Sequence, residues 1–245
     1  MTAREQFDAE NRARIAAMAG DTTLRTLSRE WFTASCRYRY SYHFTWLGLP
    51  VIQYPQDLLA MQEIIWRTRP EVIVETGVAH GGSLVFFASM LEMLGAPGRV
   101  VGVDIEIRRH NRAAIESHPL AGRITMLEGS STDLAIVEKV RTLARAVSSV
   151  LVVLDSNHTH DHVLRELELY SPLVRPGGYL IVMDTVVEDL PAELFPDRPW
   201  RPGDSPRTAV QAFLKGNDRF QVDEEIENKL LVTVAPGGYL RCVRE

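Results

Sequence analysis

Short apolar runs alternate with amphipathic stretches along most of this 245-residue chain. Near-continuous apolar runs predict buried strands, whereas apolar positions three or four residues apart predict helices. The expected strands are 71–75, 99–103, 123–127, 149–154 and 179–183. The expected helices around them are 56–68, 83–95, 109–118, 132–146, 160–172 and 207–215. Apolar strands separated by helices predict a parallel sheet that is covered on both faces.

The two ends of the chain depart from this alternation. Helical spacing predicts helices at 3–19 and 23–35, and the aromatic-rich segment 38–54 that follows is interpreted as a connection without regular structure. Near the other end, the runs 219–223 and 229–234 flank a short acidic link and predict an antiparallel hairpin. The expected fold is therefore α/β: a doubly wound, mostly parallel, seven-stranded sheet with a C-terminal antiparallel hairpin and N-terminal helices.

Composition narrows the class of protein. The net charge of −5 argues against general binding to a nucleic-acid backbone, and hydrophobic residues make up an ordinary 45%. Two distant cysteines, Cys36 and Cys242, form no disulfide framework and fit a reducing cytoplasm. The charged N-terminus carries no secretory apolar core, and apolar runs are too short to span a membrane. The N-terminal helices and aromatic segment suggest a surface for homo-oligomer formation.

The turn after the first parallel strand carries the strongest chemical signal. It reads ETGVAHGGS from Glu75 to Ser83, and it links a strand to a helix. A dinucleotide site requires G-x-G-x-x-G, with helix N–H groups facing a pyrophosphate. Here an acid ends the strand, and an acid repels phosphate and attracts ammonium. The expected ligand therefore lacks phosphate and is positively charged, which indicates S-adenosylmethionine (SAM) and disfavours an NAD-dependent oxidoreductase.

Three segments together resemble one family. ETGVAHGGS, VLDSNHTHDHVLRELELYSPLVRPGGYLIVMDT and WLGLPVIQYPQDL are similar to the cephalosporin hydroxylase / rhamnosyl O-methyltransferase family of bacterial secondary metabolism, and the resemblance covers roughly residues 44–240. It implies a Rossmann-like class I methyltransferase fold, SAM and a divalent cation. The expected domains are a helical and aromatic cap at 1–55 and a methyltransferase domain at 56–245. The hydroxylase part of the family name is set aside, because the chain shows no haem, flavin or recognisable iron-site pattern.

Cofactor contacts are expected where the first three parallel strands end, because ligands of open α/β sheets bind at that edge. Glu75 would hold the amino group, and Ser83 with the helix N-terminus would meet the carboxylate. Asp104 would accept from the ribose hydroxyls, although it could instead cap the next helix. Glycines allow close backbone approach. The remaining expected cofactor contacts are Gly77, Gly81, Gly82, Gly129, Ser130 and Asp155, of which Gly129 and Ser130 resemble the adenine-contacting turn of this fold. Ser131, next in sequence, could cap the following helix.

Two acids follow the last two parallel strands. Asp155 and Asp184 would repel each other unless a proton or cation lay between them, and oxygen ligands suit Mg²⁺. By similarity to cation-dependent methyltransferases of the catechol type, both aspartates would bind the metal and Thr185 would be the third ligand. Asn157 or a water is an alternative to Thr185, because a hydroxyl is a weaker ligand than a carboxylate.

A histidine-rich loop begins just beyond Asp155. The spacing of His158, His160, Asp161 and His162 does not match a usual zinc set. Histidine titrates near neutrality, so His158 is the expected general base, with Asp155 as the other catalytic residue. The other two histidines are expected to cap the helix or to be exposed.

These expectations combine into a reaction. A metal-assisted O-methyltransferase would move a methyl group from SAM to a hydroxyl of a small natural-product intermediate, with a catechol-like ring as first choice and a sugar diol as second. The loop 187–206 and the aromatic segment 38–54 would form the lid of its pocket. The expected wall residues are Tyr42, His43, Phe44, Trp46, Phe195 and Trp200. The non-enzyme alternative is a SAM-binding assembly subunit without turnover.

Overall fold

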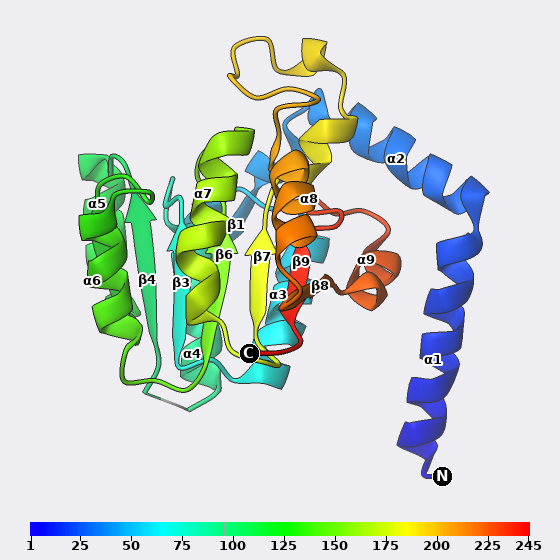
Figure 1. Cartoon of the computed structure of the whole chain (residues 1–245), viewed down its shortest axis with the longest axis horizontal. Helices are drawn as coiled ribbons and strands as arrows, with labels where there is room; N and C mark the ends of the chain where they lie inside the picture. Colours follow the sequence, from blue (N-terminus) through cyan, green and yellow to red (C-terminus); the bar gives the residue numbers. More distant parts are fainter. Residues whose placement is uncertain (96) are drawn as a thin grey trace.

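The computed structural model describes residues 1–95 and 97–245. In this part of the chain a mostly parallel seven-stranded sheet has the order β5-β4-β3-β6-β7-β9-β8 (Figure 1). Its strands are β3 (Val72–Thr76), β4 (Arg99–Asp104), β5 (Ile124–Glu128), β6 (Val150–Leu154), β7 (Tyr179–Val182), β8 (Phe220–Val222) and β9 (Tyr239–Cys242). β3 to β7 pair in parallel, and β9 runs antiparallel to both β7 and β8. The predicted doubly wound α/β fold is confirmed.

Helices cover both faces of the sheet, as the apolar strands require. One face packs against α3 (Pro55–Thr68), α4 (Gly82–Met93) and α5 (Arg109–Glu116). The opposite face packs against α6 (Leu134–Ala144), α7 (His160–Tyr170) and α8 (Pro206–Gly216). Along each strand, successive side chains alternate between the hydrophobic core on one face of the sheet and the core on the other.

β3 illustrates this alternation. Ile73 belongs to the core beneath α3 and α4, whereas Val72 and Val74 belong to the core beneath α6 and α7. All three side chains are buried. A one-residue slip in register would exchange the two cores, so the pairing of the strand is strongly specified.

The predicted second strand of the C-terminal hairpin is wrong. Residues of the acidic link form a helix, α9 (Glu224–Leu230), instead of a turn. Asp223 begins this helix because its side chain accepts a hydrogen bond from the backbone N–H of Ile226. The strand that pairs with β8 is β9, further along the chain, where Tyr239, Leu240 and Cys242 are buried.

The helices α1 (Ala3–Gly20) and α2 (Thr22–Cys36) agree with the sequence, but the aromatic segment does not. It contains a short 3-10 helix, η1 (Tyr40–His43), and an antiparallel hairpin of β1 (Phe44–Trp46) and β2 (Leu49–Val51). Leu47 and Gly48 both have positive φ, the condition for a tight two-residue hairpin turn. The short strands were missed because only three residues contribute to each.

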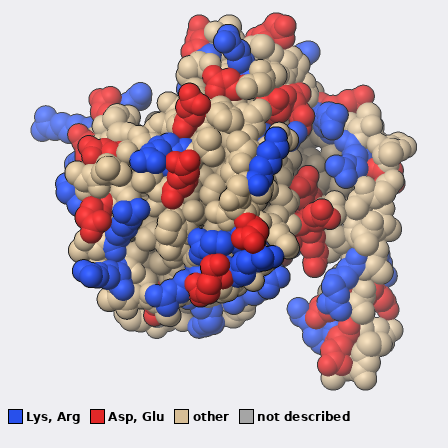
Figure 2. All heavy atoms as spheres, in the orientation of Figure 1, with Lys and Arg blue, Asp and Glu red and all other residues tan. Residues whose placement is uncertain are grey.

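α1 lies at the side of the molecule, where it contacts α9 and buries none of its residues (Figure 1). None of the described helices has the length and apolarity needed to cross a membrane. On the face shown in Figure 2, basic and acidic side chains are interspersed.

Candidate active site

A cavity of 680 Å³ opens at the carboxyl ends of the parallel strands. Its floor consists of residues that follow β3, β4, β5, β6 and β7, and the N-terminal segment and the loop after η4 (Thr185–Asp189) form its walls. The floor residues include Gly77, Asp104, Ser130, Asp155 and Asp184. The topology therefore gathers the acids and small residues that the sequence singled out.

The glycines of the first turn are required by the protein's own backbone. A Cβ on Gly77, which has φ +91°, would lie 2.0 Å from the carbonyl oxygen of Asp155. A Cβ on Gly82 would lie 2.2 Å from the carbonyl oxygen of Pro50 in β2. These glycines were expected to allow close approach of a cofactor. In the structure, Gly77 and Gly82 allow close approach of the backbone at Asp155 and at Pro50. Gly81 has φ +83° and packs against Ile115.

A second, smaller cavity of 40 Å³ lies beside this turn. It is lined by the turn from Gly77 to Ser83 together with Ile52, Gln53 and Asp155. Gln53 is 4% exposed, and its side-chain oxygen has no hydrogen-bond partner among the described residues. Sequence reasoning missed Gln53, because a single glutamine in the connection between β2 and α3 has no pattern that distinguishes it.

Glu75 is buried at the end of β3 and accepts a 2.7 Å hydrogen bond from the hydroxyl of Ser83. Burial raises the pKa of Glu75 to about 8; the Ser83 hydrogen bond opposes this rise and the charge of Asp104 adds to it. Removal from water penalises the charged form of a carboxyl, and the single hydroxyl compensates only in part. Ser83, expected at the cofactor carboxylate, points to Glu75 in this structure.

Asp104 supports the glycine turn from the neighbouring strand. Its Oδ2 accepts from the backbone N–H groups of Val78, at 2.8 Å, and Ala79, at 3.3 Å. Its Oδ1 accepts from the N–H of Glu106. The bonds to Val78 and Ala79 hold the turn in shape. Asp104 also lines the large cavity, at the position expected for the ribose.

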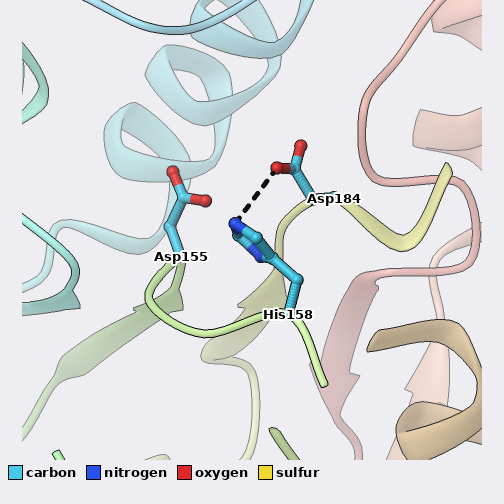
Figure 3. A group of neighbouring side chains, drawn as sticks. All are labelled: Asp155, His158 and Asp184. Carbon is cyan, nitrogen blue, oxygen red and sulfur yellow. Dashed lines mark ion pairs between the residues drawn. The ribbon is translucent and has the colours of Figure 1, made fainter. Parts of the chain in front are cut away.

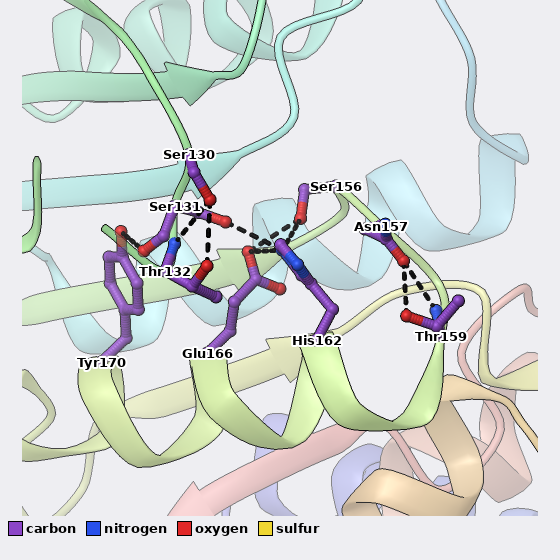
Figure 4. A network of polar contacts seen from close by, with 9 residues as sticks. All are labelled: Ser130, Ser131, Thr132, Ser156, Asn157, Thr159, His162, Glu166 and Tyr170. Atoms are coloured by element: carbon purple, nitrogen blue, oxygen red, sulfur yellow. Dashed lines mark hydrogen bonds and ion pairs between the residues drawn. The ribbon is translucent and has the colours of Figure 1, made fainter. Parts of the chain in front are cut away.

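The turn after β5 is tied to α7 by a polar network (Figure 4). The hydroxyl of Ser131 lies 3.0 Å from Nε2 of His162, and the hydroxyl of Tyr170 donates to the carbonyl of Ser131. Ser156 donates to Glu166, which is fully buried on α7. The sequence-based interpretation missed Glu166, although its place on the apolar face of α7 could have revealed it.

Gly129 and Ser130, expected at the adenine, precede this network. Gly129 has φ +146°, and its N–H donates to the carbonyl of Asp104. Ser130 lines the large cavity, and its hydroxyl lies 2.9 Å from that of Thr132. Ser131, considered as a helix cap, bonds to His162 instead, and Asp133 caps α6.

Three side chains converge beyond β6 and β7 (Figure 3). Asp155, His158 and Asp184 each offer one ligand atom, and these atoms all lie within 4.8 Å of one another. Nε2 of His158 is 3.4 Å from Oδ2 of Asp184. Because β6 and β7 are parallel neighbours, residues just past their ends meet at one edge. Asp184 has φ +53°, in the left-handed region that residues other than glycine rarely adopt. This backbone conformation sets the direction in which its side chain leaves the end of β7, toward Asp155 and His158.

The pKa of Asp155 is raised well above its ordinary value. Burial is the main cause, followed by the negative charges of Asp184, Glu75 and Glu166. Gln53 opposes the rise by donating a 2.9 Å hydrogen bond to Asp155. The negative charges around this half-buried carboxyl favour a cation that enters the site.

The third member of this group is His158, whereas the sequence-based expectation was Thr185. Thr185 is fully buried, and its hydroxyl donates a 2.8 Å hydrogen bond to the carbonyl of Pro236. The side-chain oxygen of Asn157 accepts from the N–H and hydroxyl of Thr159. Both alternative oxygens are already engaged in hydrogen bonds with neighbouring residues.

The remaining histidines of the loop leave in other directions. Nδ1 of His160 lies 2.8 Å from the hydroxyl of Thr208 on α8, and its backbone N–H donates to Asp204. His162 turns to the network of Figure 4. Of the loop histidines, only His158 therefore reaches the aspartates.

Aromatic side chains form one wall of the large cavity. Trp200 is 9% exposed; its ring packs against Phe195 at 5.0 Å and against His158 at 6.1 Å between centroids. Tyr42 also lines the cavity, as predicted. Trp46 lies elsewhere, since it donates to Ser89 and packs on Phe86 of α4. The structure adds the aromatic side chains of Phe32, Tyr40 and Tyr54 to the cavity lining; His43 and Phe44 are not among the residues that line this cavity.

Comparisons with known proteins agree with this fold. The rhamnosyl O-methyltransferase of Mycobacterium tuberculosis is 33% identical over 202 residues, covering 80% of this chain and 77% of the relative. An apo structure of CmcI is 22% identical with a TM-score of 0.59, covering 83% of this chain and 78% of that one. A CmcI structure with Mg and SAM is 21% identical with a TM-score of 0.56, covering 82% and 77%.

The family model described as rhamnosyl O-methyltransferase/CmcI matches residues 38–243. This range includes the whole sheet, the glycine turn and the group formed by Asp155, His158 and Asp184. The chain therefore belongs to the rhamnosyl O-methyltransferase/CmcI family.

Proposed function

We propose that this SAM-dependent O-methyltransferase methylates one hydroxyl of a vicinal diol on a small natural-product intermediate, with a divalent cation in the site. One observation carries the proposal: Asp155, His158 and Asp184 converge on the cavity of 680 Å³ at the edge of the sheet where cofactors of this fold bind.

The residues present fit a divalent cation. Two carboxylates and an imidazole are within reach of one point. The pKa of Asp155 is raised first by burial and then by neighbouring negative charges, which a cation would neutralise. Asp155 and Asp184 would hold the cation, and Gln53 orients Asp155 through its hydrogen bond. A bound divalent cation would polarise a substrate hydroxyl and lower its pKa.

The residues around the glycine turn support the position of SAM. Glu75 is buried beside the turn, where the cofactor's ammonium group would stabilise its charged form. Asp104 and Ser130 line the cavity of 680 Å³, at the ends of successive strands, in the order expected for ribose and adenine. The side-chain oxygen of Gln53, which has no hydrogen-bond partner within the described part of the chain, would supply an additional acceptor at the methionine end.

His158 has two competing roles within this proposal. As a general base it would accept the hydroxyl proton at Nε2, the atom that approaches Asp184. As a ligand it would use the same atom, so one nitrogen cannot perform both tasks at once. The two roles therefore exclude each other.

The wall formed by Trp200 and Phe195 suits a cyclic substrate that lies flat against an aromatic ring. The relatives are named for a rhamnosyl group, which makes a sugar diol a stronger candidate than the sequence alone did. A catechol ring presents the same pair of adjacent oxygens. We further propose that residues 1–55 act as the cap of the cavity, because Tyr40, Tyr42 and Tyr54 line it.

Methyl transfer from SAM with a labelled methyl group tests this function. The purified enzyme is incubated with rhamnosides, other glycosides and catechols, and the products are identified by mass. The expected result is one added methyl group on a diol oxygen, lost after EDTA treatment and lost in Asp184→Ala. Absence of methyl transfer to every diol would contradict the substrate class. Full activity of Asp184→Ala in EDTA would contradict the role of the cation.

Thermal stabilisation separates the alternatives. S-adenosylhomocysteine should raise the melting temperature, because a ligand that binds only the folded state stabilises it. Stabilisation by NAD alone would favour an oxidoreductase. Binding of S-adenosylhomocysteine without methyl transfer to any acceptor would favour an assembly subunit.

A further inference from the structure

The group at the ends of β6 and β7 contains a nitrogen where an all-oxygen set was expected. We propose that Nε2 of His158 is the third protein ligand of the cation, and that the site favours a transition-metal dication such as Co²⁺, Fe²⁺ or Zn²⁺ over Mg²⁺ more strongly than an all-carboxylate site would. This inference rests on the proposed cation dependence and deepens it by naming the class of metal.

The geometry assigns the third ligand position to His158, because the neighbouring side-chain oxygens are already hydrogen-bonded to other residues. The hydroxyl of Thr185 donates to Pro236, the amide oxygen of Asn157 accepts from Thr159, and the hydroxyl of Ser156 donates to Glu166. Each of these oxygens is therefore already engaged with a neighbouring residue. The imidazole of His158 needs no rearrangement, because its Nε2 already lies with the two carboxylates.

The imidazole is also held in place before any ligand arrives. The ring of Trp200, itself buried against Phe195, packs edge-on against His158 and leaves its side chain 18% exposed. Asn157 and Thr159, which flank His158 in sequence, are hydrogen-bonded to each other and fix the loop that leads into α7. A ligand whose rotamer is restricted by packing loses little entropy when it binds a metal.

The chemistry of the donor set then decides the metal. Carboxylate, carbonyl and water ligands suit Mg²⁺, whereas imidazole suits iron, nickel, copper and zinc. Mg²⁺ also demands near-ideal octahedral oxygen geometry and gives up its waters reluctantly. Replacement of one oxygen ligand by imidazole nitrogen weakens the site for Mg²⁺ and strengthens it for a softer ion.

Direct metal binding tests the assignment without reliance on turnover. Affinities for Co²⁺ and Mg²⁺ are measured by calorimetry on the wild type, His158→Asp and His158→Ala. Because every oxygen site also prefers Co²⁺ to Mg²⁺, the informative quantity is the ratio of the two affinities. His158→Asp should lower this ratio about tenfold or more, since it restores an oxygen set. An unchanged ratio would overturn the proposal.

A spectroscopic signature identifies the ligand itself. Pulsed electron paramagnetic resonance of the Cu²⁺-loaded protein should show modulation from an imidazole nitrogen in the wild type and in His160→Ala, and none in His158→Ala. His160 is the matched control, because its ring bonds to Thr208 and not to the aspartates. Persistence of the signal in His158→Ala would overturn the assignment, as would its loss in His160→Ala.

Folding and function are separated by two further readings. Circular dichroism and binding of S-adenosylhomocysteine establish that each variant is folded, and the folded His158→Asp variant keeps the test valid if His158→Ala unfolds. Failure of the wild type to bind either metal would overturn this inference and the cation dependence, but not methyl transfer. A nitrogen-ligated metal in a protein that methylates no diol would instead contradict only the proposed substrate.

Discussion

Gln53 donates a hydrogen bond of 2.9 Å from Nε2 to Oδ2 of Asp155, across 102 positions of sequence. The bond joins the segment before α3 to the end of β6, so the boundary expected at residue 55 separates two parts that share one site. Gln53 is buried, and it orients the aspartate that the proposed cation requires.

Gln53→Leu should therefore weaken cation binding by about 10- to 100-fold, the usual effect of losing a group that orients a metal ligand. Without the donated bond, the pKa of Asp155 should also rise further. Gln56→Leu is the matched control, because the side-chain oxygen of Gln56 has no hydrogen-bond partner among the described residues. Calorimetric titration with Co²⁺ measures both variants, and equal affinities would remove Gln53 from the site.

The pKa of Glu75 predicts how stability depends on pH. Burial raises this pKa from 4.5 to about 8, so between these values the folded protein keeps a proton that the unfolded chain has lost. The unfolded state then binds fewer protons, and the free energy of unfolding should fall by about 1.4 kcal/mol per pH unit across this window. Glu75→Gln cannot ionise and should not show this component.

Urea unfolding from pH 5 to pH 9 without cofactor measures the difference. Glu75→Gln should gain stability relative to the wild type as the pH rises, and the gain should level off above about pH 8. The same variant should bind S-adenosylhomocysteine more weakly, because its neutral amide lacks the charge that attracts the ammonium group. A difference in stability that does not vary with pH would show that Glu75 is charged in both states.

Gly82 is a test of the tight packing beneath the cavity. Its Cβ would meet the carbonyl oxygen of Pro50 at 2.2 Å, and backbone atoms of the β1–β2 hairpin cannot move aside as a flexible side chain could. Gly82→Ala should destabilise the fold by about 1–3 kcal/mol or more, the usual cost of overpacking. Gly122→Ala is the control, because nothing lies within 4 Å of its Cβ position. Thermal unfolding of the two variants should differ clearly.

This contact also explains what the sequence could and could not predict. Apolar runs such as Val150–Leu154 predicted the order of strands and helices, because a strand that is buried on both faces is apolar along its whole length. The hairpin that touches Gly82 has strands of only three residues, which leave almost no pattern. The glycines were predicted to be sites of close contact, but the expected contact was with a cofactor and not with the backbone of this hairpin.

The two acids were predicted as metal ligands and His158 as the base beside them, but the third ligand position was assigned to Thr185. Asp155 and Asp184 meet because β6 and β7 are parallel neighbours, a relationship that follows from the predicted topology. The orientations of Thr185 and His158 depend on rotamers and on local bonds to Pro236 and Asp184, which no spacing rule encodes. In the same way, the helix begun by Asp223 displaced the predicted last strand.

Trp200 connects the wall of the cavity to its chemistry, because its ring contacts both Phe195 and the imidazole of His158. Trp200→Ala should raise the KM for the hydroxylated acceptor about tenfold, since about 1.4 kcal/mol of ring contact is lost, while the KM for SAM should change little. Trp200→Phe keeps an aromatic face and should restore most of the affinity.

Steady-state kinetics on the acceptor identified by product mass measures both constants, with Trp46→Phe as the control. Trp46 packs on Phe86 outside the cavity, so its substitution should leave the acceptor KM near that of the wild type. An equal rise in both KM values for Trp200→Ala would indicate a general loss of structure. A rise confined to the acceptor supports the aromatic wall as the surface against which the substrate ring lies.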